Sequence, residues 1–297
     1  MARKCQTKLE GSMVALITPF RKGKLDEKAL ANLVRFQIEN GTDALVPCGT
    51  TGESATMTHE EHRRAVEVVI EAAEGRVPII AGTGSNSTEE AISLTRHAKK
   101  AGADAALLIT PYYNRPTQEG LFRHFEAVAK AVDIPIVLYN VPTRTGVNLE
   151  PATAARLSKI ASVVALKDAA GNLKQTADTI EACEGRLSLL SGDDFLLLPM
   201  LAIGARGGIA VISNIVPHLM AELWDAWLAG DWERTKAIHY KIHPLNRCMY
   251  LETNPIPVKW AAHKMGLCTP EIRLPLTPLA EKFQPPLEKE MAALGLI

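Results

Sequence analysis

The chain has 297 residues, enough for one large α/β domain or two ordinary ones, and 47% of them are hydrophobic, which suffices for a sizeable core. Basic and acidic residues balance at 33 each, so no net charge indicates nucleic acid or an anionic membrane as a partner. The N-terminal apolar run is too short for a signal peptide, and the most apolar stretch elsewhere, 195–205, is interrupted by Pro199 and Gly204. We therefore expect a soluble, cytoplasmic protein.

The cysteines indicate a reducing compartment. They are five in number, widely scattered, and never form a CxxC pair, which argues against a disulfide framework or a zinc site. Cys48 lies beside a glycine-rich motif, where we expect it to act as a small buried hydrophobic residue. The cysteines are Cys5, Cys48, Cys183, Cys248 and Cys268.

Short apolar runs recur along the first 212 residues, and they are nearly continuous in apolar character rather than alternating. That pattern is typical of parallel strands buried on both faces. Segments of helical periodicity separate the runs, as at 60–73, 88–101, 120–132 and 173–182. The runs are 13–17, 44–46, 78–81, 105–109, 134–139, 163–167, 187–190 and 208–212.

Eight strand–helix units in this length predict an α/β fold, a (β/α)8 TIM barrel, which typically needs about 250 residues. After residue 230 the strand signal stops and helical segments follow at 231–248, 255–266 and 286–294. We therefore predict a catalytic barrel over 1–230 and a small helical domain over 231–297. An open dinucleotide-binding sheet is the alternative, but the segment 82–87 lacks the third glycine of its fingerprint.

Lys167 is the most informative residue, because it ends the apolar run 163–167. Burial of a lysine is costly and disfavours its charged form. A neutral amine can attack a carbonyl carbon and form a Schiff base. On this stretch alone, a lysine that extends to solvent from the strand end is the favoured interpretation, because buried lysines are rare.

Other reactive groups stand at the same predicted edge of the barrel, where barrel enzymes carry their active sites. The loop 49–54 offers two hydroxyls and glycine-flanked N–H groups for a carboxylate, although a glycine turn with a helix cap would look similar. Tyr139 and Lys167 share inward parity on adjacent runs, so a phenol and an amine come together. Arg144 could bind a second carboxylate. The combination indicates Schiff-base chemistry on a keto acid.

At these residues the chain resembles the dihydrodipicolinate synthase family, within the pyruvate-dependent class I aldolases that include N-acetylneuraminate lyase. The resemblance covers nearly the whole chain, with no departure at the catalytic positions. The loop YNVPTRTG, with its arginine, favours the synthases over the sialic acid lyases. The motifs are GTTGES at 49–54, ITPYYNRPTQEG at 109–120, YNVPTRTG at 139–146, ALKDAAGN at 165–172, LLSGDD at 189–194 and NPIPVKW at 254–260.

The resemblance implies condensation of pyruvate with L-aspartate-4-semialdehyde on the route to diaminopimelate and lysine. Lys167 would form the imine, and Tyr139, Thr51 and Tyr113 would relay protons, with Tyr113 reaching in from a neighbouring subunit of a homotetramer built as a dimer of dimers. Arg144 would bind the semialdehyde carboxylate. No metal or organic cofactor is implied. The residues expected around pyruvate are Thr50, Thr51, Gly192 and the backbone of Ile209.

The resemblance also implies an allosteric site at which L-lysine, the pathway end product, inhibits. Without the resemblance, the polar segment 59–62 would be read as a solvated helix face, or as a metal pair of two histidines that lacks further ligands. Glu90 would pair with the α-amino group of the effector. The expected residues are Ser54, Ala55, His59, His62, Asn86, Glu90 and Tyr112.

Three alternatives stay open at this point. One is another pyruvate-type aldolase that acts on a sugar acid or a hydroxy-oxo acid, and the effect of replacing Arg144 would discriminate it. A second is a catalytically inactive barrel that binds small acids as a sensor, against which Lys167, Tyr139 and Tyr113 argue. The third, an NAD-dependent oxidoreductase, rests only on the Gly-Thr-Gly at 82–84.

Overall fold

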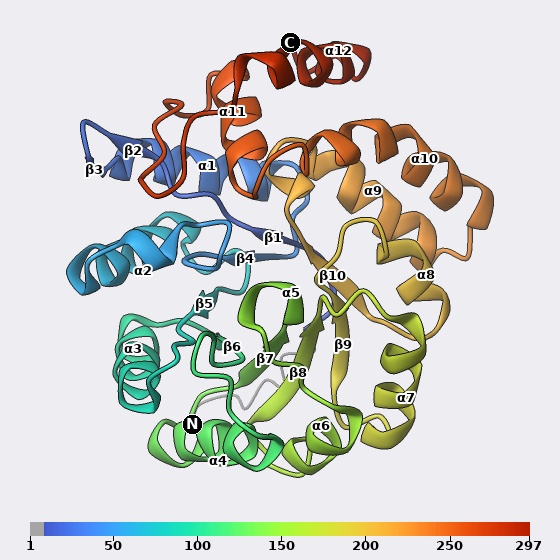
Figure 1. The fold of residues 1–297 in the computed structure, drawn as a ribbon. Coiled ribbons are helices and arrows are strands. Elements are labelled where there is room, and N and C mark those ends of the chain that lie inside the picture. Colours follow the sequence, from blue (N-terminus) through green and yellow to red (C-terminus); the bar gives the residue numbers. More distant parts are fainter. Residues whose placement is uncertain (1–8) are drawn as a thin grey trace.

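The computed structural model describes residues 9–297 and forms a (β/α)8 barrel, as the sequence predicted (Figure 1). Eight parallel strands follow one another around the barrel in the order β4-β1-β10-β9-β8-β7-β6-β5. The strands are β1 (Gly11–Ala15), β4 (Ala44–Val46), β5 (Ile80–Gly82), β6 (Ala105–Ile109), β7 (Ile136–Asn140), β8 (Val163–Asp168), β9 (Ser188–Ser191) and β10 (Gly207–Ala210).

The barrel closes between β4 and β5, where Leu45 forms a parallel bridge with Ile79 and its N–H donates to the carbonyl of Pro78 at 3.0 Å. Gly82 is required at this seam, because a Cβ there would lie 2.3 Å from the carbonyl oxygen of Cys48. Alternate strand residues such as Met13, Val137 and Ala165 fill the interior in one cluster, and the opposite strand faces pack against the surrounding helices.

Some strand boundaries differ from the prediction. The first strand begins at Gly11 rather than at residue 13, since Gly11 pairs in register with Gly207 of β10. The last strand ends at Ala210, two residues early, because Ile212–Asn214 turns into a short 3-10 helix, η2. Apolarity alone does not distinguish these buried ends, because Leu16, Ile17 and Ile212 remain buried outside the strands.

Helices surround the barrel, and the predicted helical segments are confirmed with boundary shifts of a few residues (Figure 1). Thr58 caps α2 in a reciprocal capping box with Glu61, which fixes where the helix begins after the loop 49–54. A small hairpin of β2 (Phe20–Arg21) and β3 (Lys24–Leu25) was not predicted. The barrel helices are α1 (Glu27–Glu39), α2 (His59–Ala73), α3 (Thr88–Ala101), α4 (Gln118–Ala131), α5 (Pro142–Thr145), α6 (Pro151–Leu157), α7 (Leu173–Cys183), α8 (Leu197–Ala202) and α9 (Pro217–Leu228).

The C-terminal region is helical, as predicted, with α10 (Trp232–Cys248), α11 (Ile256–Lys264), the short 3-10 helix η3 (Glu281–Phe283) and α12 (Gln284–Ala293). Another 3-10 helix, η1 (Ser54–Thr56), precedes α2. The loop between α10 and α11 brings residues 250–254 to the carboxyl end of the barrel, where they border the same cavity as β7 and β8. No helix within residues 9–297 is long and apolar enough to cross a membrane. The division at residue 230 remains a prediction.

Candidate active site

Lys167 lies in β8 at the carboxyl end of the barrel, and only 5% of it is exposed. Its Cα is in register with that of Tyr139 on β7, and its Nζ lies 4.2 Å from the centre of the Tyr139 ring. The predicted shared parity is therefore confirmed, because both side chains face the interior of the barrel. The structure places a lysine amine and a phenol together in a buried setting.

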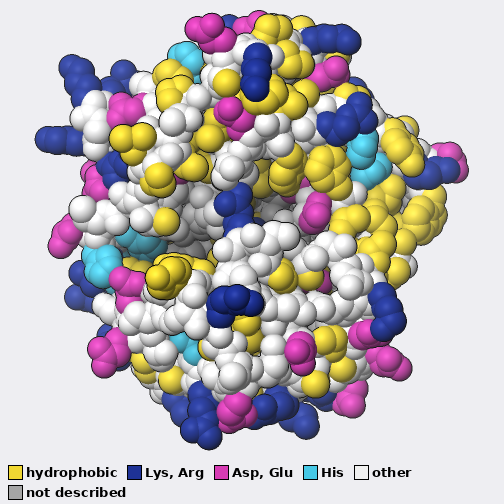
Figure 2. All heavy atoms as spheres, viewed as in Figure 1, with side chains coloured by type: hydrophobic (Ala, Val, Ile, Leu, Met, Phe, Trp, Pro, Cys, Tyr) yellow, Lys and Arg dark blue, Asp and Glu magenta, His cyan; other side chains and the backbone are white. Residues whose placement is uncertain are grey.

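A cavity of about 570 Å³ opens at this edge of the barrel and holds Lys167, Tyr139, Thr50 and Thr51 in its wall. Gly192, at the end of β9, leaves the space that the Lys167 side chain occupies, because a Cβ at position 192 would lie 3.0 Å from Lys167 Cε. Figure 2 shows the hollow at the centre of this face, with Lys/Arg and Asp/Glu side chains interspersed around it. The volume suits a small molecule.

The two threonines come from the loop 49–54 between β4 and α2. Thr51 is buried, and its Oγ1 accepts a hydrogen bond of 3.0 Å from Nδ2 of Asn254. Thr50 is half-buried and lies in the wall of this cavity and of a neighbouring one. Hydroxyl groups and loop N–H groups at this point can hold a carboxylate without burying an unpaired cation.

Arg144 stands at the rim of the cavity, exposed, on the short helix α5 after β7. Its Nη2 donates to the backbone carbonyl of Asn254 at 3.2 Å, which leaves most of its donors unengaged. A planar guanidinium at the mouth of a cavity suits bidentate binding of a carboxylate. The position therefore fits the role expected from the sequence.

Two of the expected residues are not in the cavity wall. Ile209 is fully buried in the inner cluster, and the neighbouring Val211 lines the cavity instead. Tyr113 is 90% exposed and has a positive φ of 71°, a conformation that is uncommon for a tyrosine. Within a single chain, Tyr113 therefore does not complete the site.

Sequence reasoning missed the contribution of the C-terminal region, which supplies Tyr250, Glu252, Thr253 and Asn254 to the cavity wall. These residues follow α10, more than 80 positions after Lys167, and no local pattern connects them with the barrel. The motif NPIPVKW, which begins at Asn254, indicated the family but not that Asn254 lines the cavity. Asp193, in the motif LLSGDD, also lines the cavity.

Asp194 is a buried carboxyl that shapes this wall. It accepts the backbone N–H groups of Val211 at 3.0 Å and of Ile212 at 2.8 Å, and so holds the chain as it leaves β10. Burial raises the pKa of Asp194 to about 6, although the backbone N–H groups and the charge of Lys167 act in the opposite direction. Tyr250, also in the wall, has a raised pKa because it is buried near carboxylates.

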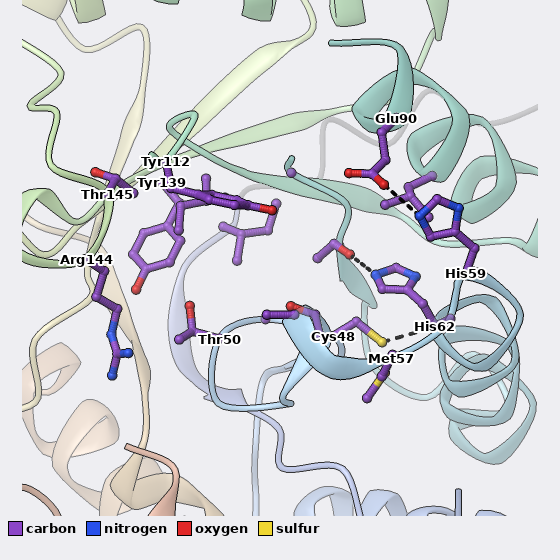
Figure 3. A pocket seen from close by; sticks show the side chains of 18 residues that line it. Cys48, Thr50, Met57, His59, His62, Glu90, Tyr112, Tyr139, Arg144 and Thr145 are labelled. Carbon is purple, nitrogen blue, oxygen red and sulfur yellow. Dashed lines mark hydrogen bonds and ion pairs between the residues drawn. The ribbon is translucent and has the colours of Figure 1, made fainter. Parts of the chain in front are cut away.

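A second cavity of about 430 Å³ adjoins the first, and Thr50, Tyr139 and Arg144 line both. In Figure 3 these three side chains lie at one end of the second cavity, with His59, His62 and Glu90 at the other. All but one of the residues expected at the effector site line it: Ser54, Ala55, His59, His62, Glu90 and Tyr112. Asn86 lies outside its wall, and its backbone carbonyl accepts a hydrogen bond of 2.9 Å from Nδ2 of Asn114.

The polar groups of the second cavity are partly paired with one another. His59 Nε2 lies 2.6 Å from Glu90 Oε1, and Ser85 donates to the other Glu90 oxygen, which lowers the pKa of that carboxyl. Burial lowers the pKa of His62 to about 4, so its ring is neutral at pH 7. Its Nε2 is 2.9 Å from the carbonyl of Gly82, and therefore carries the proton.

The neutral ring of His62 leaves Nδ1 as an acceptor, and this buried atom has no partner among residues 9–297. An ionised carboxylate and an unused imidazole acceptor together suit an ammonium group. In the described part of the chain, no three His, Cys, Asp or Glu side chains are arranged to hold a metal ion. Cys48 is buried as expected, its Sγ donates to the carbonyl of His62, and burial raises its pKa to about 12.

Comparisons with known proteins agree with this geometry. The model of the dihydrodipicolinate synthetase family matches residues 8–294. The 4-hydroxy-tetrahydrodipicolinate synthase of Geotalea uraniireducens is 55% identical over 288 residues, which cover 97% of this chain and 99% of that protein.

Solved structures are similar over the same length. A dihydrodipicolinate synthase from Acinetobacter baumannii, described as chloride-inhibited and in complex with pyruvate, superposes with a TM-score of 0.95 at 48% identity, covering 97% of this chain and 99% of that one. The enzyme from Cyanidioschyzon merolae with lysine bound gives a TM-score of 0.94 at 39% identity, covering 97% and 99%. The chain belongs to the dihydrodipicolinate synthetase family, and it is a lyase of that family.

Proposed function

We propose that this enzyme condenses pyruvate with L-aspartate-4-semialdehyde, with Lys167 as the Schiff-base nucleophile. The observation that carries the proposal is a buried lysine amine at a strand end, 4.2 Å from the Tyr139 ring and next to a loop of hydroxyl groups. Support comes from the pyruvate complex of the Acinetobacter baumannii relative and from the name of the Geotalea uraniireducens relative, 4-hydroxy-tetrahydrodipicolinate synthase.

The residues of the site fit the steps of this reaction. The Lys167 amine adds to the pyruvate carbonyl and water leaves, while Tyr139 carries protons. The imine loses a C3 proton to give an enamine, which attacks the aldehyde carbon of the second substrate. The amino group of that substrate then displaces Lys167 as the ring closes, which frees the lysine for the next turnover. Thr50 and Thr51 hold the pyruvate carboxylate, and Gly192 leaves room for the Lys167 side chain beside it.

Turnover with a choice of aldehydes tests this proposal. Pyruvate is supplied with L-aspartate-4-semialdehyde, or with a sugar aldehyde of similar length that lacks the carboxylate. We expect a strong preference for the semialdehyde, and the replacement Arg144→Leu should raise its KM by about 10- to 100-fold, as expected for loss of a charged hydrogen-bonded pair. A preference for the sugar aldehyde would identify the enzyme as another pyruvate aldolase.

Tyr113 supports a proposal about assembly. Because this tyrosine is exposed at the carboxyl edge of the barrel, a second copy of the chain can receive it. We propose that Tyr113 completes the proton relay of a neighbouring subunit, within a homotetramer of tight dimers. Mixing inactive Tyr113→Phe protein with inactive Lys167→Met protein, under subunit exchange, should then restore activity, because one mixed site contains neither replacement. Mixtures that stay inactive, although exchange is verified, would contradict a shared site.

The second cavity supports feedback inhibition by L-lysine. Glu90 and the Nδ1 acceptor of His62 offer partners for an ammonium group, and the Cyanidioschyzon merolae relative is described with lysine bound. We expect millimolar L-lysine to inhibit, and Glu90→Gln to raise the concentration needed by about tenfold or more, since a charge-assisted contact is lost. Turnover without lysine serves as the reference. No inhibition of the active wild-type enzyme would contradict the proposal.

A further inference from the structure

Asn254 connects the two functional parts of the cavity through two different groups of one residue. Its side-chain Nδ2 donates to Thr51 Oγ1 at 3.0 Å, and its backbone carbonyl accepts from Arg144 Nη2 at 3.2 Å. Thr51 is the predicted relay hydroxyl, and Arg144 is the predicted binding group for the aldehyde substrate. Asn254 itself lies in the cavity wall and is 7% exposed.

The direction of the first hydrogen bond limits what the Thr51 hydroxyl can do. A hydroxyl has one proton to donate and two lone pairs that accept. The amide N–H of Asn254 donates to one lone pair of Thr51 Oγ1 and does not accept the hydroxyl proton. The proton of Thr51 therefore stays available for another partner. A relay hydroxyl must pass a proton on, so a donor at this position keeps Thr51 in the competent orientation.

The Asn254 segment is fixed relative to the Thr51 loop by a second contact. Lys259, on α11, forms a fully buried ion pair with Glu53, two residues after Thr51. Glu53 also accepts the backbone N–H of Arg273 at 3.1 Å, and the Lys259 N–H donates to the carbonyl of Pro255 at 3.0 Å. The loop and the segment 254–259 therefore meet at two points, the hydrogen bond between Asn254 and Thr51 and the ion pair between Lys259 and Glu53.

We propose that Asn254 is a positioning residue for the condensation: its side-chain amide orients the Thr51 hydroxyl for proton transfer, while its backbone carbonyl holds Arg144 at the rim. This inference rests on the proposed function. It makes a separable prediction, because side-chain replacements remove only the contact with Thr51. The contact with Arg144 involves the backbone carbonyl, which these replacements do not remove.

The first test compares Asn254→Asp with Asn254→Ala in steady-state turnover. Both should lower kcat by about 10- to 100-fold, somewhat less than loss of a general acid or base. The KM for the semialdehyde should change less than about threefold, because the Arg144 contact is kept. The aspartate has the same shape but an ionised carboxylate cannot donate, so its activity relative to Asn254→Ala should rise at acidic pH, where a protonated carboxyl can donate to Thr51.

The second test is a double-mutant cycle with Thr51→Val. If Asn254 acts through Thr51, Asn254→Ala should reduce kcat little further in the Thr51→Val background. Independent, additive losses would overturn the proposal, as would wild-type kcat in Asn254→Asp at neutral pH. Thermal unfolding shows whether each variant is folded, and Asn254→Asp, which keeps the shape, decides the matter if Asn254→Ala does not fold.

The outcomes separate this inference from the proposed function. A wild-type enzyme that forms no borohydride-trappable adduct with pyruvate would overturn the proposed function itself. A wild-type enzyme that forms the adduct, together with Asn254 variants that match it in kcat, would overturn only the role of Asn254.

Discussion

Two lysines are buried within residues 9–297, and their surroundings differ. Lys167 is 5% exposed in the barrel, and Lys259 is 1% exposed in α11. Each has its Nζ over an aromatic ring, at 4.2 Å from the Tyr139 centre and at 4.3 Å from the Phe20 centre. Burial and an aromatic neighbour therefore do not distinguish them.

The difference is the counterion. Lys259 is paired with Glu53, which is equally buried, and burial lowers the pKa of Lys259 although the Glu53 carboxylate acts to raise it. Within residues 9–297, no carboxylate lies within ion-pair distance of Lys167. A carboxylate that paired Lys167 would hold the proton on the amine and stop it from attacking a carbonyl. A paired buried lysine therefore stabilises the fold, and an unpaired one is available for chemistry.

The largest effect should follow from Lys167→Met. A methionine fills a similar volume but offers no amine, so turnover should fall by several orders of magnitude, as when an enzyme loses its nucleophile. Stability should not fall, because an amine without a counterion is removed from a buried position. Steady-state assays and thermal unfolding measure the two quantities. Substantial residual turnover would show that Lys167 is not the nucleophile.

Lys259→Met should have the opposite profile. It leaves the Glu53 carboxylate buried without its cation, and breaking a buried pair costs about 3–5 kcal/mol of folding free energy. Denaturant unfolding measures this loss. The double variant Glu53→Gln/Lys259→Met should recover part of the loss, because no uncompensated charge remains. Equal loss in the single and double variants would show that the ion pair is not what Lys259 contributes.

The smallest effect concerns His62, a third buried base. Its pKa is lowered to about 4 by burial, against about 6.5 when it is exposed in the unfolded chain. The unfolded state therefore binds more protons between these values, and stability falls as the pH drops below about 6.5. His62→Gln should weaken this loss between pH 6.5 and pH 5. Part of the loss should remain in the variant, because burial also lowers the pKa of His124 to about 4. Unfolding curves that shift equally with pH would contradict the assignment.

The sequence predicted the part of the site that local periodicity controls. Strand parity was enough to direct Tyr139 and Lys167 inward, because side chains in a strand alternate between two faces. The sequence could not predict that Asn254 contacts Thr51, since 203 residues separate them. Only the folded chain places the segment before α11 beside the loop 49–54. The same holds for Lys259, whose position in a helical run gave no sign of its partner.

Strand ends and Tyr113 show a second limit. Ile212 is as apolar as any strand residue, so its exclusion from β10 depends on the carboxyl of Asp194 holding the backbone there. Tyr113 was expected at the relay, but in one chain it is exposed and does not line the cavity, and no local sequence pattern indicated this.

Borohydride trapping with pyruvate, followed by peptide mass mapping, tests the contrast between the two lysines most directly. The folded enzyme is incubated with pyruvate and borohydride, and the reduced adduct is located in the digest. We expect the adduct on Lys167 and an unmodified Lys259 in the same sample, because only the unpaired amine can attack the carbonyl. An adduct on Lys259, or none on Lys167 in folded protein, would contradict the account.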